Sequence, residues 1–448
     1  MRKDFRTWFA GLFLIGLIAC APTPRPPTPT IERILATPAP YMTETPIPTS
    51  TPKPTPTSLP RTGAAAAFDV ARALEHNRFI AQEIGARPVG SDEDRRAGDY
   101  ISDQFGALGY DVEWQEFTYD VWVNNNTDLQ LIEPTKRDLD NIPLYYSPAG
   151  NAEGELVAIE GFGAPADFAK TDATGRIALV QRGNISFTEK VNNAVKAGAV
   201  AILIYNNAPG NYEGALDAKS AIPALALSGR EGKALLDAFA KGTPYLRIES
   251  DTGYEKHPAR NILARKRGAT DNVILLGAHY DSIEIGQGAV ANASGVAVML
   301  ELARVFHDIK LKHTLVFAAF DAHQVGLRGS EYYASHLPDA ARKKVDAMLD
   351  FDTVGGGSGP LIAGGNGRAG KLAREAARAL GIESRDFDFG ESAASDHLPF
   401  VNIGIDSVYL ARSYTLQRTP QDVFEEVREP FLSQAGHAGA RLIETLDQ

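Results

Sequence analysis

The sequence predicts an α/β fold with a mostly parallel sheet and helices on both of its faces. Apolar runs of strand length recur at 273–276, 314–320, 347–351 and 407–410, and such near-continuous runs are typical of strands buried on both faces. Segments with helical spacing of apolar residues separate the runs, which favours a layered α/β architecture. From 120 to 255 the pattern becomes β-rich, so we expect a second domain there.

The N-terminus has the pattern of a bacterial export signal. Met1-Arg-Lys is positively charged, and the apolar stretch 8–19 is too short for a comfortable membrane span. Leu17-Ile-Ala-Cys20 resembles the lipobox of a lipoprotein signal, and Cys20 is the single cysteine of the chain. We therefore predict a signal peptide over 1–20 and a lipid anchor at Cys20 that holds the exported chain on the extracytoplasmic side of a membrane. Internal disulfides and cysteine-ligated metal sites are excluded.

Composition divides the rest of the chain. Residues 21–60 are mainly Pro and Thr, which predicts a disordered linker. The remainder exceeds one typical core. We expect an α/β domain formed by 61–119 and 256–448, interrupted by a domain at 120–255. The net charge of -11 and the absence of basic runs argue against a nucleic-acid partner.

The first folded segment predicts two helices joined by a turn. Residues 68–81 have helical periodicity. Arg87-Pro-Val-Gly90 predicts a turn, Ser91 is a suitable N-cap for the second helix, and Gly109 is a suitable end for it. This part alone indicates nothing beyond local structure.

The stretch around the strand at 273–276 holds the first candidate chemistry. His279 and Asp281 follow this strand, and ligands of open α/β sheets bind at the carboxyl ends of strands. An imidazole there can bind a metal while a carboxylate two residues on orients a neighbour. A histidine satisfied at a strand end is the alternative, and His-x-Asp alone favours it.

Six motifs in order strengthen the functional interpretation. They are Gly277-Ala-His-Tyr-Asp-Ser, Asn292-Ala-Ser-Gly-Val, Gly326-Leu-Arg-Gly-Ser-Glu-Tyr-Tyr, Phe351-Asp-Thr-Val-Gly, Ser395-Asp-His-Leu-Pro-Phe and Thr419-Pro-Gln-Asp. Together they resemble the zinc aminopeptidases of peptidase family M28, which have a zinc-exopeptidase fold. The resemblance runs from about residue 71 to the C-terminus.

The segment 120–255 resembles the protease-associated (PA) domain. The resemblance rests on Ile177-Ala-Leu-Val, Arg182-Gly, 198–205 and Ile222-Pro. The Arg87-Pro-Val-Gly-Ser turn with the helix after it resembles the N-terminal opening of the M28 family, and the six motifs follow from residue 277. Because the resemblance lies on both sides of 120–255, we expect an insertion without a catalytic role. We expect Arg182 and Lys190 to be solvated or structural rather than ligand-binding.

In the family, two zinc ions share a bridging carboxylate, and a Glu takes the proton of the attacking water. Carried over by motif, the resemblance implies that His279 and Asp352 are ligands of the second metal. It implies that Asp281 orients His279. These three positions are retained.

Four other positions depart from the family pattern. Ala291 stands where the bridging Asp belongs, and His323 stands at the general-base position. Gln324 replaces a ligand Glu, and Arg418 replaces a ligand His. The first metal therefore loses its protein ligands, because neither alanine nor a guanidinium binds zinc.

These departures favour a pseudoenzyme, as in transferrin-receptor-like relatives, that binds a peptide or protein in the cleft without a cofactor. The alternative is a peptide hydrolase with one zinc on His279 and Asp352, to which His323 adds a third ligand or a base. Glutaminyl-cyclase-like chemistry is disfavoured, since it needs the first metal position. We also expect Arg418 to lie near Asp352 or Asp281 and to replace the zinc charge, and we expect His397 to be structural.

Overall fold

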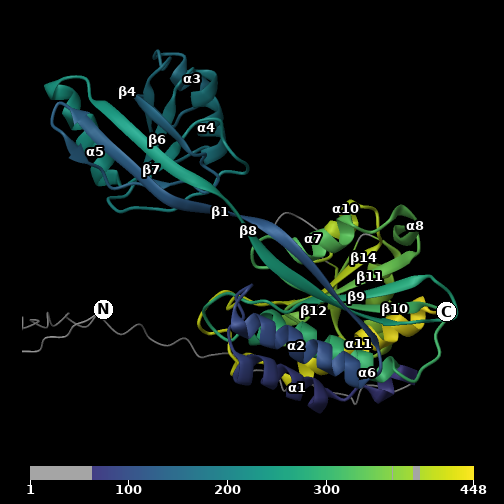
Figure 1. The fold of residues 1–448 in the computed structure, drawn as a ribbon. Coiled ribbons are helices and arrows are strands. Elements are labelled where there is room, and N and C mark those ends of the chain that lie inside the picture. The colour runs from purple at the N-terminus through teal and green to yellow at the C-terminus, as the bar shows by residue number, and fades with distance from the viewer. Residues whose placement is uncertain (1–62, 366, 387–393) are drawn as a thin grey trace, which may run out of the picture. The chain divides into compact units, whose positions relative to one another are not determined.

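The structure is a computed structural model that describes residues 63–365, 367–386 and 394–448 (Figure 1). The predicted signal peptide, Cys20 and the linker to residue 60 lie outside the described residues. The description below therefore concerns the folded part of the chain.

One continuous sheet forms the centre of the α/β domain. Its strand order is β13-β12-β14-β11-β9-β10-β8. The pairs β10–β9, β9–β11, β11–β14 and β12–β13 are parallel, whereas β12–β14 and β8–β10 are antiparallel. The strands are β8 (Tyr245–Lys266), β9 (Val273–His279), β10 (Thr314–Phe320), β11 (Val345–Phe351), β12 (Ser358–Gly364), β13 (Ser384–Arg385) and β14 (Ser407–Ser413). The strands that the apolar runs predicted are therefore the parallel centre of a mixed sheet.

Helices cover both faces of this sheet, as predicted (Figure 1). The larger core lies against α1 (Val70–Arg78), α2 (Asp92–Ala107), α6 (Ser294–Phe306), α9 (Arg368–Ala379) and α11 (Glu429–Leu446). The opposite face packs against α7 (Arg328–Ser335) and α10 (Leu398–Asn402). Shorter helical segments are η1 (Gly63–Ala67), η2 (Phe79–Ile84), η4 (Ala289–Ala293), α8 (Asp339–Arg342) and η6 (Phe424–Glu426).

Local signals explain the helix that leads to the site. The Ser91 side chain accepts a hydrogen bond from Asp94 N at the start of α2, and the chain leaves the helix through Gly109 at φ 74°. Within the described residues, one helical stretch, Ala289–Phe306, is apolar and long enough to cross a membrane. Because 94% of it is buried in the protein, it is the core helix of the domain.

The strands of the β-rich segment continue the same sheet past β8, and the segment has its own hydrophobic cores. Its strands and helices are β2 (Arg137–Asp138), β3 (Ile142–Pro143), β4 (Gly150–Ala158), β5 (Ile177–Gln181), β6 (Ala201–Tyr205), β7 (Ala224–Leu227), α3 (Pro165–Phe168), α4 (Phe187–Lys196), α5 (Gly229–Ala238) and η3 (Phe239–Lys241). Lys190 is buried, and its Nζ donates to the carbonyls of Phe162 and Gly183, so this lysine is structural.

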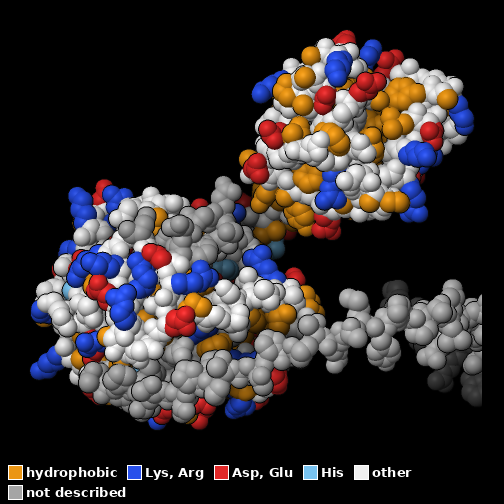
Figure 2. All heavy atoms as spheres, turned by 180° about the vertical axis from the view of Figure 1, so that it is seen from behind, with side chains coloured by type: hydrophobic (Ala, Val, Ile, Leu, Met, Phe, Trp, Pro, Cys, Tyr) orange, Lys and Arg blue, Asp and Glu red, His pale blue; other side chains and the backbone are white. Residues whose placement is uncertain are grey.

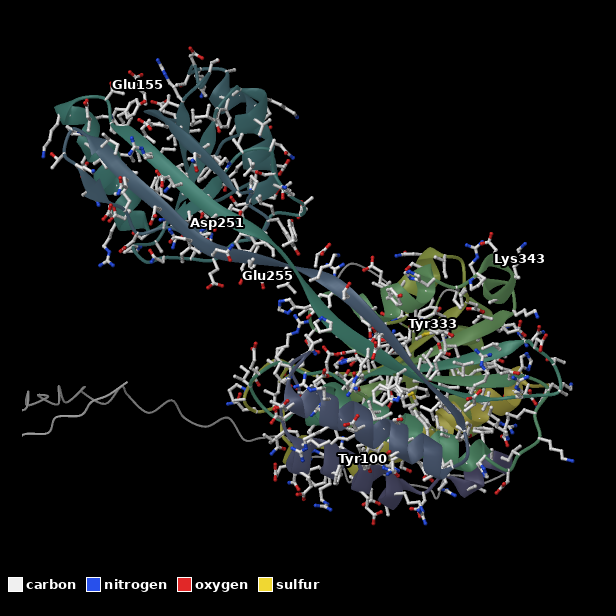
Figure 3. The ribbon with its side chains drawn as sticks, viewed as in Figure 1. Tyr100, Glu155, Asp251, Glu255, Tyr333 and Lys343 are labelled. Atoms are coloured by element: carbon white, nitrogen blue, oxygen red, sulfur yellow. The ribbon has the colours of Figure 1, made fainter. Side chains whose placement is uncertain are left out.

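Two long strands connect the segment to the α/β domain. β1 (Asp111–Glu133) and β8 pair antiparallel from Asp111↔Arg265 to Glu133↔Tyr245. Figure 3 marks Asp251 and Glu255 on β8. The backbone ladder is therefore continuous through both expected domain boundaries.

Charged side chains of both signs are interspersed over the face of the molecule that Figure 2 shows.

Candidate active site

The carboxyl ends of three adjacent parallel strands bring the candidate residues together. β9 ends at His279, β10 is followed by 321–323, and β11 is followed by Asp352. β9 lies between β10 and β11 and is parallel to both. The predicted location at a strand-end crevice follows from this topology.

His279 lies between two buried carboxylates. Its Nδ1 is 3.3 Å from Asp281 Oδ1, and its Nε2 is 3.6 Å from Asp352 Oδ1. The side chain is 1% exposed. Burial opposes the charged ring, but the hydrogen bonds and charges of both carboxylates outweigh it and raise the pKa of His279 well above its ordinary value. These contacts favour the imidazolium form of His279, whose charge is opposite to that of the two acids.

The two carboxylates respond in the opposite direction. Burial alone would raise their pKa values, but the contacts with His279 lower the pKa of Asp352 to about 2 and also lower that of Asp281. Asp281 further accepts the backbone N–H groups of His323 and Gln324 at 3.1 and 2.9 Å. Asp281 thus orients both His279 and the segment that follows β10.

His323 stacks on His279. The ring centroids are 3.7 Å apart, and the ring planes differ by 11°. Its Nδ1 is 3.0 Å from Asp396 Oδ2, and Ser330 Oγ donates to Asp396 Oδ1 at 2.6 Å. Ser395 Oγ donates to Asp352 Oδ2 at 2.9 Å. His323 is held from both its ring face and its edge.

Three of these residues could hold one metal ion. The ligand atoms of His279, His323 and Asp352 lie within 4.8 Å of one another, and Asp352 Oδ1 has no hydrogen-bond partner among the described residues. The lone pair of an imidazole nitrogen lies in the ring plane, so the lone pairs of two stacked rings run side by side instead of converging. The residues therefore fit a single ion once one ring has turned.

The first metal position does not fit a metal ion. Gln324 Oε1 accepts a hydrogen bond from Arg418 Nε at 3.0 Å. The N–H of Ala291 donates to Asp422 Oδ2 at 3.2 Å, so that segment stays fixed without a side-chain carboxylate of its own. At the positions of the carboxylate and imidazole ligands, Gln324 and Arg418 form an amide–guanidinium hydrogen bond, and Ala291 has only a methyl side chain.

The expectation for Arg418 is not met. Its side chain is exposed, and no salt bridge in the described part of the chain joins it to Asp281 or Asp352. His279 supplies the positive charge instead, because its ring lies directly between the two acids.

Two neighbouring groups have structural roles. The N–H of His397 donates to Asp350 Oδ2, and His397 Nδ1 lies 3.0 Å from the same oxygen. Arg87 is fully buried, and its guanidinium donates to the carbonyls of Tyr280, Gln287 and Gly288. Burial lowers the pKa of Arg87 to about 10, so it remains charged at neutral pH.

Sequence reasoning missed the residues that support the site. Ser330, Ser395 and Asp396 contact the cluster from positions distant in sequence. Their presence within the quoted motifs was the available signal. Arg87 was interpreted only as part of a turn.

Comparison with known proteins identifies the family and the fold. The sequence model of "Peptidase family M28" matches residues 261–443, and that of "PA domain" matches 152–235. The solved aminopeptidase from Aneurinibacillus sp. strain AM-1 is similar at 30% identity and TM-score 0.68, over 86% of this chain and 95% of that one. The zinc aminopeptidase BSAP from Bacillus subtilis is similar at 27% identity and TM-score 0.64, over 84% and 95%.

Curated sequences give the same picture. Aminopeptidase YwaD of Bacillus subtilis (strain 168) is 29% identical over 383 residues, which is 80% of each chain. Leucine aminopeptidase 2 of Trichophyton equinum is 32% identical over 274 residues, and the match spans 60% of this chain and 54% of that protein.

Proposed function

The chain belongs to peptidase family M28 and carries an inserted PA domain, and from that premise we propose that it is a lipid-anchored, peptide- or protein-binding pseudoenzyme. The observation that carries this proposal is that protein groups pair with one another at both former metal positions. His279 pairs with Asp281 and Asp352, and Gln324 pairs with Arg418. A buried acid pair that a protein cation already neutralises needs no metal for stability.

The reaction of the family requires groups that these residues do not provide. Two bound zinc ions would supply an activated water and polarise the peptide carbonyl. A carboxylate must then take the proton of that water, and position 323 carries an imidazole whose Nδ1 lies against Asp396. Loss of the bridging carboxylate at Ala291 and of the ligand at Gln324 removes the support for the first ion.

The test compares the natural chain with a reconstructed site. The full chain, purified in detergent and supplied with zinc, is expected to bind peptides in calorimetry but not to hydrolyse leucine p-nitroanilide or di- to tetrapeptides. Combining A291D, H323E, Q324E and R418H is expected to give two zinc ions per chain and measurable hydrolysis. Chelator-sensitive hydrolysis by the natural chain would overturn the proposal.

One observation favours a second candidate, a peptide hydrolase with a single metal. His279, His323 and Asp352 bring three ligand atoms within 4.8 Å, and three protein ligands with an open position are typical of catalytic zinc. One zinc per chain that is lost in H279A, together with zinc-dependent hydrolysis lost in H323A, would establish this candidate. A matched control is H307A, since His307 is exposed at the end of α6.

The anchor is tested separately. We expect incorporation of labelled palmitate into the chain in bacterial cells and loss of that label in C20S. Equal labelling of C20S would contradict the anchor without affecting the binding proposal.

A further inference from the structure

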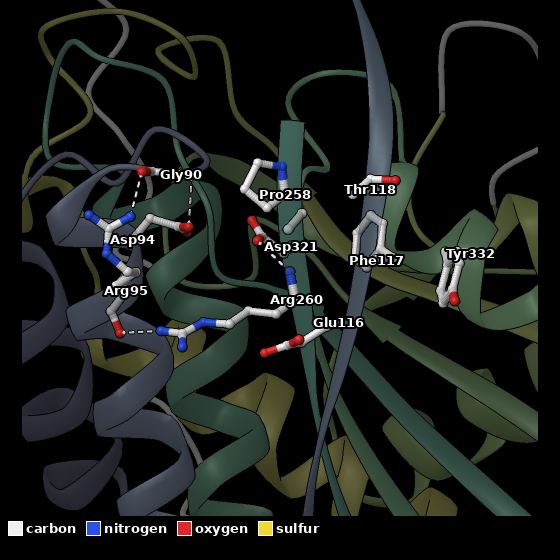
Figure 4. Close-up of a pocket in the computed structure, with 11 residues that line it drawn as sticks. Gly90, Asp94, Arg95, Glu116, Phe117, Thr118, Pro258, Arg260, Asp321 and Tyr332 are labelled. Carbon is white, nitrogen blue, oxygen red and sulfur yellow. Dashed lines mark hydrogen bonds between the residues drawn. The ribbon is translucent and has the colours of Figure 1, made fainter. Parts of the chain in front are cut away.

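A cavity of about 550 Å³ lies within the α/β domain, and Asp321 of the segment after β10 is part of its lining (Figure 4). Its walls are formed by the start of α2, by residues 116–118 of β1 and 258–260 of β8, and by Asp321 after β10. None of the residues assigned above to the metal positions lines it. This cavity is therefore separate from the degenerate zinc site.

Two deeply buried carboxylates line the cavity. Asp94 is 2% exposed and Asp321 is 1% exposed. Asp321 accepts backbone hydrogen bonds from Arg260 and Ala322. Asp94 Oδ2 accepts one from Gly90 N at 3.0 Å, whereas its Oδ1 has no hydrogen-bond partner among the described residues. A buried carboxylate oxygen without a partner is costly. Since this oxygen is itself buried, a ligand that supplies a donor would gain by binding there only once the side chains around Asp94 have moved.

The arginines near the cavity are committed elsewhere. Arg260 Nη2 donates to Arg95 O at 2.9 Å and to Asp99 Oδ1 at 3.3 Å, and its guanidinium lies 4.1 Å from the ring centre of Trp114. Arg95 donates to Gly90 O. No salt bridge within the described residues joins a cation to Asp94 or Asp321. The two carboxylates thus lack a cation in direct contact.

The remaining lining selects the kind of cation. Phe117 stacks on Tyr332 with ring centroids 4.9 Å apart, and both rings line the cavity together with the exposed Glu116. Aromatic rings favour an alkyl stem or an organic cation. The volume falls in the range of small-molecule sites and far exceeds what a bare metal ion occupies.

We propose that this cavity binds the lysine or arginine side chain of a peptide ligand, with the cationic head at Asp94 and Asp321 and the stem along Phe117 and Tyr332. This inference rests on the proposed peptide-binding function and names its ligand class. Glu116 adds negative charge at the wall and favours the same ligand.

The experiment measures calorimetric affinity of the full chain in detergent for Ala-Lys-Ala and for Ala-norleucine-Ala, which has a similar stem and no charge. The lysine peptide is expected to bind at least about tenfold more tightly, as befits hydrogen bonds to charged groups. D94N, which keeps an acceptor for Gly90 N–H, is expected to lose that preference. D103N is the matched control, because Asp103 is exposed on the same helix.

Failure of this inference can be told from failure of the proposed function. Equal affinity for both peptides, or an unchanged preference in D94N, overturns the cavity assignment and leaves peptide binding intact. If neither peptide binds, the melting temperature is measured with and without butylammonium chloride. A rise for the natural chain that is absent in D94N supports cation binding in the cavity. The absence of a rise for the natural chain overturns it. The same two affinities are measured for E116Q, in which an exposed charge of the lining is removed. If both E116Q and D94N keep the preference of the natural chain for the lysine peptide, the electrostatic basis of the proposal is refuted.

Discussion

Replacing Asp94 with asparagine is expected to stabilise the fold, and to do so more at pH 8 than at pH 5. Burial is the main cause that raises the pKa of Asp94 from 3.8 to about 7, although the hydrogen bond from Gly90 opposes the rise. Because the folded chain holds this proton more tightly than the unfolded chain, Asp94 favours the fold at low pH. That advantage is lost as the pH rises from about 4 through about 7.

The magnitude follows from the two pKa values. A folded pKa of about 7 in place of 3.8 means that ionised Asp94 costs the fold about 4 kcal/mol relative to the unfolded chain. Much of this cost is already absent at pH 5, where the folded carboxyl is protonated. The stability gained by D94N should therefore be larger at pH 8 than at pH 5 by about 2–3 kcal/mol.

The assay is urea unfolding at pH 5, 6.5 and 8, followed by tryptophan fluorescence. Trp114 reports on the relevant region because it packs against Arg260 beside the cavity. D103N controls for loss of one surface charge and should follow the natural chain at every pH. A D94N stability difference that does not change between pH 5 and pH 8 would refute the reasoning, because asparagine does not titrate.

Three further predictions concern the former metal positions. H279A leaves Asp281 and Asp352 buried without a cation and should lower the free energy of unfolding by about 3–5 kcal/mol; a loss below about 1 kcal/mol in urea unfolding would contradict the ion-pair assignment. R418A should change the free energy of unfolding by no more than about 0.5 kcal/mol, as is usual at exposed positions, and a larger loss would restore the idea that Arg418 replaces the zinc charge. Dialysis of the full chain against a chelator should leave its melting temperature unchanged, and a fall that zinc reverses would favour the single-metal hydrolase.

The fold could be predicted because its determinants are local. The apolar runs at 273–276 and 314–320 specify buried strands by composition, and family motifs on both sides of 120–255 indicate an insertion. Both predictions are confirmed by the sheet topology and by the family comparisons. The antiparallel edge pairs were not predicted, because strand direction at a sheet edge depends on connections that composition does not encode.

Partners at the site could be predicted only in part. His279 and Asp281 are two residues apart at a strand end, so their contact follows from strand geometry. The contact of His323 with Asp396 joins positions 73 residues apart, and nothing local specifies it. The partner of Arg418 depended on loop conformation, and an electrostatic argument alone chose the wrong one.

In the proposed metal-free site, the geometry does not need the charge of Arg418. In the family arrangement, several carboxylates balance two divalent ions. Once the bridging and base carboxylates have become Ala291 and His323, two acids remain, and one imidazolium reaches both. A bridging Asp retained at position 291 would have added a third buried anion beside a single protein cation, a cost of several kcal/mol. We infer that three departures act together in the proposed metal-free site: Ala291, His323 and Gln324 each remove a carboxylate, and the two acids that remain can be balanced by one cation.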